Sequence, residues 1–118
     1  PEEDAYYHWM LKQWQNGQTH IKIEGGESPE DVVARQSAAW NYILSKSDEQ
    51  TILICMHGRA MRILLTQILN YPLKSMDVFE HQNLCLYVVQ GTGRMFRLEK
   101  HNDVAHLQMK VREKHQLT

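Results

Sequence analysis

A histidine and a glycine interrupt an otherwise apolar stretch of this sequence, which reads ILICMHGRAMRILL from Ile52 to Leu65. A core strand has no structural use for a titratable ring, whereas an imidazole can donate a hydrogen bond or a proton to a bound anion. Gly58 lets an anion approach the backbone closely. If a helix starts here, its first turn adds unpaired N–H groups and the positive end of the helix dipole. The pattern indicates an anion site at His57; the alternative is a hydrogen-bonded, structural histidine.

Two arginines follow this pair. Arg59 and Arg62 add positive charge near the candidate site, and we expect them on different sides of the helix. In open α/β sheets, ligands bind at the carboxyl ends of the strands, which is where His57 would stand if residues 51–56 form a strand.

The surrounding elements follow from apolar spacing. Apolar residues at three- and four-residue steps predict a helix over residues 1–16, with Tyr6, Tyr7, Met10, Leu11 and Trp14 on one face. Ser28, Pro29 and Asp31 form a helix-start signal, which predicts a second helix over residues 28–45. Its buried stripe should consist of Val32, Val33, Ala39, Trp40, Ile43 and Leu44.

The continuous apolar run at residues 51–56 predicts a parallel strand covered on both faces. A largely buried helix should follow over residues 59–69, and Asn70 and Pro72 should stop it. Residues 72–83 read as irregular, and the runs on either side of Gly91-Thr92-Gly93 read as a hairpin. These elements favour an α/β layer architecture. A buried parallel strand needs neighbours that this order does not supply, so part of the sheet is expected to be missing.

Composition excludes several functions. The 118 residues carry 13 Lys and Arg against 14 Asp and Glu, for a formal charge of −1, so nucleic-acid or membrane binding has no electrostatic basis. No run is long enough to span a membrane. Cys55 and Cys85 lie in apolar runs without C-x-x-C spacing, which indicates buried thiols in a reducing cytoplasm and no structural zinc. His101 and His106 are five apart, a poor spacing for a metal pair.

Four segments then add a family resemblance: GGESPEDVVAR, TILICMHGRAMRILLTQILN, HQNLCLYVV and LEKHNDVAHL, in this order. Together they resemble the C-terminal half of the histidine phosphatase superfamily, also called the phosphoglycerate mutase-like family. The resemblance implies a three-layer α/β/α sheet, present here as an incomplete C-terminal portion of one domain. Residues 1–23 would be a lid or helical segment, residues 24–107 the core match and residues 108–118 a tail.

The resemblance also implies a covalent mechanism. A histidine in an Arg-His-Gly motif attacks the phosphoryl group, a phosphohistidine forms, and water or a second substrate takes the phosphate. His57 matches the family's second histidine, which binds the transferring phosphoryl group. Gly58 and Arg59 match positions whose backbone amides line the phosphate pocket. Glu27 and Ser28 match a GES motif with a mainly structural role. The substrate would be a phosphorylated small molecule, with no cofactor and no metal.

Some positions depart from the family pattern. Met56 stands where a small residue is common, and Arg59 stands where many members have glycine or asparagine. The Arg59 side chain is expected either to reach a substrate anion or to point to solvent. The sequence contains no Arg-His-Gly motif and starts at Pro1 rather than Met. We therefore expect the nucleophile and the acid before residue 1, and expect these residues alone to be inactive.

Three functions stay open at this point. A phosphomonoesterase is favoured. The alternatives are a phosphoglycerate mutase-type phosphotransfer, or a non-catalytic module that assembles with another chain. Such assembly would be a homo-oligomer or a pairing with the missing N-terminal part, because exposed sheet edges recruit partner chains.

Overall fold

The computed structural model describes residues 2–46, 51–93 and 95–107. It divides into two compact units, Pro1–Val78 and Phe79–Thr118, which are treated separately below. The first unit contains the helices α1 (Glu2–Gln15), α2 (Pro29–Lys46) and α3 (Gly58–Ile68), and the short 3-10 helix η1 (Leu73–Val78). The second contains the strands β1 (Leu86–Thr92) and β2 (Met95–Asp103). None of the described helices is long and apolar enough to cross a membrane.

The three predicted helices are confirmed to within a residue or two. α2 begins where the capping signal predicts, because Ser28 and Asp31 form two reciprocal hydrogen bonds. The Asp31 N–H donates to the Ser28 hydroxyl at 3.1 Å, and the Ser28 N–H donates to the Asp31 carboxylate at 3.0 Å. The hydrogen bond that the Ser28 backbone N–H donates to the Asp31 carboxylate is the main cause that holds the pKa of Asp31 below its usual value, and the Ser28 side chain adds to it. α3 ends at Ile68 with Leu69 as its C-cap, and the next residue, Asn70, adopts a positive φ of 60°.

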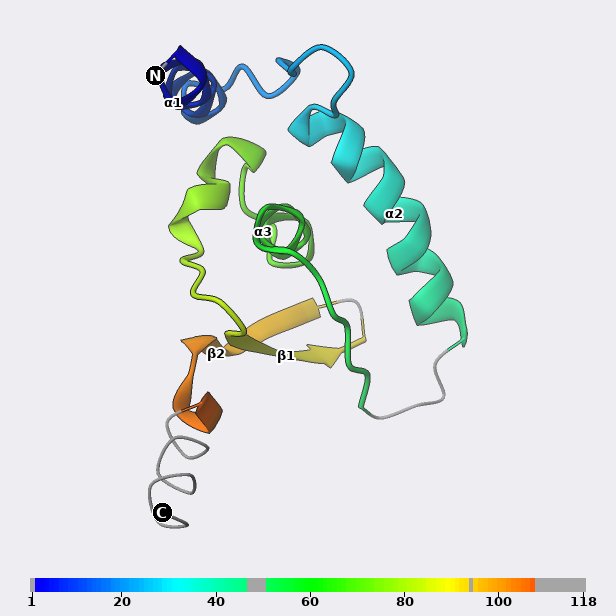
Figure 1. Cartoon of the computed structure of the whole chain (residues 1–118). Helices are drawn as coiled ribbons and strands as arrows, with labels where there is room; N and C mark the ends of the chain where they lie inside the picture. Colours follow the sequence, from blue (N-terminus) through cyan, green and yellow to red (C-terminus); the bar gives the residue numbers. More distant parts are fainter. Residues whose placement is uncertain (1, 47–50, 94, 108–118) are drawn as a thin grey trace, which may run out of the picture. The chain divides into compact units, whose positions relative to one another are not determined.

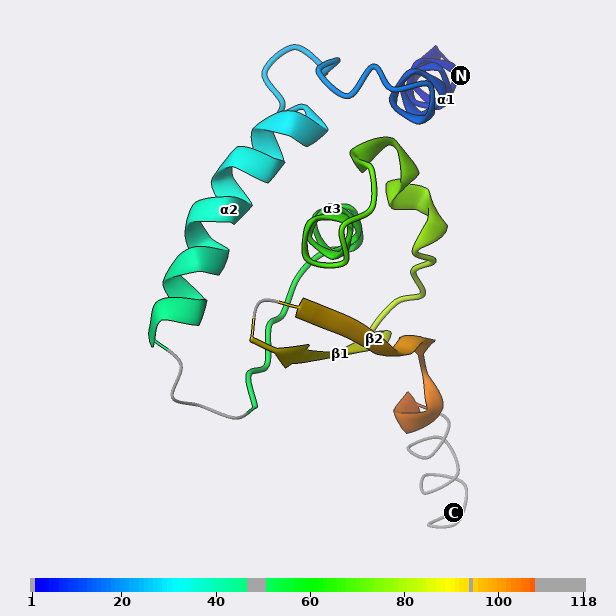
Figure 2. The same ribbon diagram turned by 180° about the vertical axis from the view of Figure 1, so that it is seen from behind.

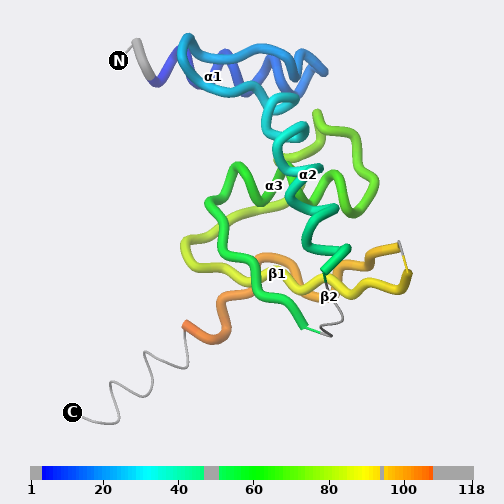
Figure 3. The backbone as a smooth tube through the Cα atoms, turned by 90° about the vertical axis from the view of Figure 1, so that its right-hand side faces the viewer, coloured from blue at the N-terminus to red at the C-terminus, as the bar shows by residue number. Residues whose placement is uncertain are grey.

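The first unit packs around α3, which lies between α2 and η1 (Figures 1 and 2). Its buried core joins α1, α3 and η1 through Met10, Trp14, Ile63 and Met76. The chain runs from α1 through residues 16–28 into the start of α2, as the tube in Figure 3 shows. The Trp14 indole N–H donates to the Ile21 carbonyl at 2.9 Å, so one core residue also holds this connection.

The apolar faces of the first two helices are narrower than predicted. On α1, Met10 and Trp14 are buried, but Tyr6 and Tyr7 are nearly half exposed. On α2, the described part of the chain covers Val32 and Val33 partly and leaves Leu44 exposed. The residue that α2 buries most fully after its start is polar Gln36, at 6% exposure. The spacing pattern therefore overestimates how much of the apolar face of each helix is covered.

The strand predicted at residues 51–56 is wrong for this structure. These residues form neither helix nor strand, and Leu53 is 80% exposed. A strand exists only through hydrogen bonds to a neighbour, and no described residue pairs with this segment. The prediction of two buried thiols is also wrong, because Cys55 is exposed and Cys85 is half-buried. The sequence KSDEQ at residues 46–50 predicts a turn, but residues 47–50 lie outside the described part of the chain.

The second unit contains the predicted hairpin. β1 and β2 pair antiparallel, with Val89 opposite Leu98 and Gly91 opposite Phe96. Gly91 and Thr92, which we expected in the turn, belong to β1, and the chain reverses at Gly93, whose φ is +64°. The α/β class is confirmed. Within the described ranges, the sheet consists of these two antiparallel strands alone.

Candidate functional site

His57 ends the exposed segment and precedes the first residue of α3. Its backbone is extended, with φ −83° and ψ 159°, and its carbonyl accepts the first helical hydrogen bond, from the Met61 N–H at 2.9 Å. His57 therefore occupies the N-cap position. Its side chain is exposed and makes no capping hydrogen bond. The ring is thus available to a ligand, whereas the structural alternative would have it bonded within the fold.

The first turn of α3 is suited to an anion. Gly58 is the first helical residue, and the turn contains no acidic residue. The leading amides of a helix have no intrahelical partner and lie at the positive end of the dipole. No carbonyl or side chain of the described residues accepts from the amides of Gly58 or Arg59. The structure therefore brings the predicted residues His57, Gly58 and Arg59 together at one helix start.

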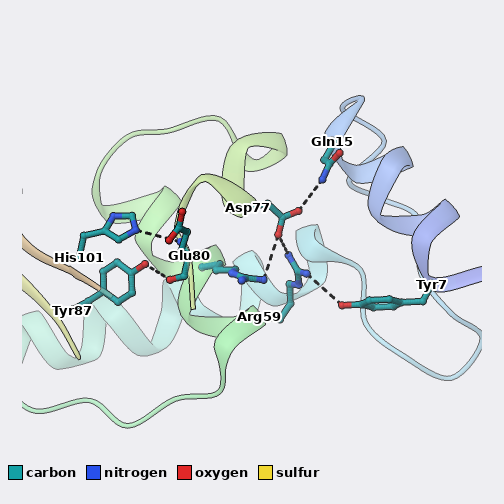
Figure 4. A network of polar contacts seen from close by, with 8 residues as sticks. Tyr7, Gln15, Arg59, Asp77, Glu80, Tyr87 and His101 are labelled. Atoms are coloured by element: carbon teal, nitrogen blue, oxygen red, sulfur yellow. Dashed lines mark hydrogen bonds and ion pairs between the residues drawn. The ribbon is translucent and has the colours of Figure 1, made fainter. Parts of the chain in front are cut away.

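The Arg59 side chain follows neither sequence-based expectation, because it is held inside the first unit. Its Nη1 lies 2.6 Å from the Asp77 carboxylate, and its Nη2 donates weakly to the Tyr7 hydroxyl at 3.4 Å (Figure 4). The guanidinium also lies over the Trp14 ring, 5.6 Å from the ring centroid. Hydrogen bonding to Tyr7 and Asp77 outweighs the burial that disfavours its charge, so the pKa of Arg59 lies above its usual value.

Asp77 is the centre of this polar network. Its carboxylate also accepts from Gln15 at 3.3 Å and lies 3.5 Å from Arg62 Nη1. The prediction that the two arginines lie on different sides of α3 is therefore wrong, since both reach one carboxylate. Burial disfavours the charged form of Asp77. The hydrogen bond and charge of Arg59, with help from Gln15 and Arg62, outweigh burial and lower its pKa.

Sequence reasoning missed Asp77, although one signal was available. It is the sole acidic residue between positions 51 and 79, a stretch that carries Arg59, Arg62 and Lys74. A lone carboxylate among cations is a candidate for an ion pair, but its partner lies 18 positions away. Only the packing of η1 against α3 decides which cation it meets.

The other flagged residues have structural partners. Glu27 forms an exposed ion pair with Arg35 at 3.0 Å. In the second unit, the Glu80 N–H donates to the His101 ring at 3.4 Å, and the Tyr87 hydroxyl donates to the Glu80 carbonyl (Figure 4). His106 contacts the Leu84 carbonyl at 3.1 Å. Among the described residues, no three His, Cys, Asp or Glu side chains gather in a way that would hold a metal ion.

Comparison with known proteins gives one finding. A family model described as the histidine phosphatase superfamily (branch 1) matches residues 1–104. The match includes α1 as well as the segments around His57. No curated protein and no solved structure gave a match.

Proposed function

This chain belongs to the histidine phosphatase superfamily, and we propose that it acts as a phosphomonoesterase in which His57 binds the transferring phosphoryl group. Membership of this superfamily supports a phosphoryl-transfer enzyme in general. The observation that carries the proposal is the N-cap position of His57: an exposed, unbonded imidazole directly before a glycine and a helix start free of acidic residues.

The chemistry follows from the family. A nucleophilic imidazole attacks phosphorus, the ester P–O bond breaks, and an acidic residue gives its proton to the leaving oxygen. Water then attacks the phosphohistidine, the N–P bond breaks, and inorganic phosphate leaves. We assign to His57 a donor role toward the phosphoryl oxygens, which charge assistance strengthens. Gly58 and Arg59 contribute backbone amides to the same oxygens, as helix starts do for anions.

The nucleophile is not among these residues, because the sequence contains no Arg-His-Gly motif. In the family's order this motif precedes the segments matched here, so we place the nucleophile and the acid in sequence before residue 1. The substrate would be a phosphorylated small molecule. A free, exposed Cys55 favours a reducing, cytoplasmic setting for this activity.

The exposed segment before His57 favours a second candidate, assembly with another chain. Leu53 is 80% exposed, and Ile52 and Ile54 are also exposed. An unpaired apolar segment of this kind is suited to strand addition. Analytical ultracentrifugation of the 118 residues tests this candidate: dimers that Leu53→Asp dissociates would support it, and a monomer at all concentrations would contradict it.

Phosphate titration of the isotope-labelled chain tests the phosphomonoesterase proposal. Inorganic phosphate should shift the amide resonances of Gly58 and Arg59. His57→Ala should weaken binding at least fivefold, whereas the control His20→Ala, at another exposed histidine, should not. Equal binding in both variants would contradict the role of His57. The chain alone should release no phosphate from p-nitrophenyl phosphate; turnover lost in His57→Ala would show a complete site within these residues.

A further inference from the structure

The backbone of Arg59 lies next to His57, but its side chain is bound elsewhere in the first unit. Its backbone belongs to the first turn of α3, two residues after His57, so their Cα atoms lie at most about 7.6 Å apart. Its guanidinium contacts Asp77, Tyr7 and Trp14, and the whole side chain is 27% exposed. The backbone of Arg59 is therefore close to the candidate phosphoryl site at His57, while the charged end of its side chain is paired with the internal carboxylate of Asp77.

The geometry of the ion pair shows that Asp77 binds Arg59 strongly. The 2.6 Å contact is a charge-assisted hydrogen bond, the strong class of such bonds. Both partners of the pair are only 27% exposed, so water screens their attraction less than at the surface. Arg62 contacts the same Asp77 oxygen as Arg59, and Gln15 donates to the other oxygen. An incoming anion would have to replace this pair to use Arg59.

We propose that Asp77 is a specificity-determining residue, which keeps Arg59 from binding a second anionic group of the substrate. This inference rests on the proposed function, because it assumes that the phosphoryl group sits at His57. With Asp77 in place, the site favours phosphomonoesters whose remaining part is uncharged. With Asp77 neutralised, Arg59 becomes available to a carboxylate or phosphate attached near the ester.

Two ligands of nearly equal size test the proposal: ethyl phosphate, which has an uncharged tail, and phosphoglycolate, which carries a carboxylate there. Their dissociation constants are measured by NMR titration of the full chain. In the wild type, phosphoglycolate should bind no better than ethyl phosphate. Asp77→Asn should improve phosphoglycolate over ethyl phosphate by about fivefold, the size expected for one partly screened charge contact. Asp77→Glu keeps the charge and should keep the wild-type ratio.

A double variant and a wild-type measurement complete the design. Asp77→Asn combined with Arg59→Met should lose the gain, because the cation is then absent. In the wild type, the Arg59 side-chain resonance should not move with phosphoglycolate, a readout that holds even if Asp77→Asn fails to fold. A purely structural Asp77 would change both affinities equally and leave their ratio unchanged, which would overturn the proposal. If both ligands bind but His57→Ala leaves that binding intact, the proposed function fails instead, and the specificity role fails with it.

Discussion

The side-chain amide of Gln36 donates to the backbone carbonyl of Ala60 at 2.8 Å, which fastens the middle of α2 to the first turn of α3. The Gln36 carbonyl oxygen in turn accepts from Gln67 at 2.9 Å, and the Gln67 oxygen accepts from the Ser37 hydroxyl at 3.0 Å. Ala60 follows directly after Arg59, so this network fixes the turn of α3 at which the candidate site begins.

Gln36→Met should therefore lower the free energy of unfolding by about 1–3 kcal/mol, because it keeps the size of the side chain but removes a partner from the half-buried Ala60 carbonyl and Gln67 amide of α3. Gln18→Met, at an exposed glutamine, should change stability by less than about 0.5 kcal/mol. Urea unfolding followed by circular dichroism measures both. Equal effects would show that the Gln36 bonds contribute nothing specific.

Local sequence signals were sufficient to predict the helices, whereas contacts between residues far apart in the sequence could not be predicted. The start of α2 depends on Ser28 and Asp31, three residues apart, so the sequence alone places it. The strand at residues 51–56 depends on neighbours elsewhere, and the described chain supplies none. Arg59 was located as a site residue by its neighbour His57, but its pairing with Asp77 depends on how η1 packs. No spacing rule could have supplied that contact.

The capping pair at the start of α2 gives the second prediction. Ser28→Ala should destabilise the protein by about 1 kcal/mol, because the N–H of Asp31 loses its acceptor at a position only 3% exposed. Ser45→Ala is the matched control at the other end of the helix, where an exposed hydroxyl donates to the Tyr42 carbonyl. It should have little effect. The loss should appear as a lower urea midpoint with an unchanged slope.

Lowering the pH should reduce the stability of the folded protein, partly because Asp77 becomes protonated. Its pKa is lowered in the folded state from the ordinary value of 3.8. Its contribution is therefore fully present above about pH 3.8 and disappears as pH falls through the lower folded value. Asp77→Asn should cost about 1–2 kcal/mol at pH 6, and its deficit relative to wild type should shrink below pH 3.8.

The control for this pH dependence is Glu27→Gln, which breaks the ion pair to Arg35. Both partners there are about half exposed, so solvent screens the pair and stability should change little at pH 6. Unfolding curves of the three proteins at pH 6, 5, 4 and 3 provide the comparison. An Asp77→Asn deficit that stays constant down to pH 3 would mean that the lost carboxylate acts through packing rather than charge.

The hairpin gives the last prediction, because Gly91 lies opposite Phe96 and the Phe96 ring covers it. A Cβ at Gly91 would lie 2.7 Å from the ring carbon Cε1, closer than atoms in contact allow. Gly91→Ala should therefore force the ring to move and destabilise the hairpin by about 1 kcal/mol. The same substitution in a Phe96→Leu background should cost less, because the shorter side chain leaves the space open. Amide hydrogen exchange at Val89 and Leu98 reports this locally. Equal costs in both backgrounds would show that the ring does not restrict position 91.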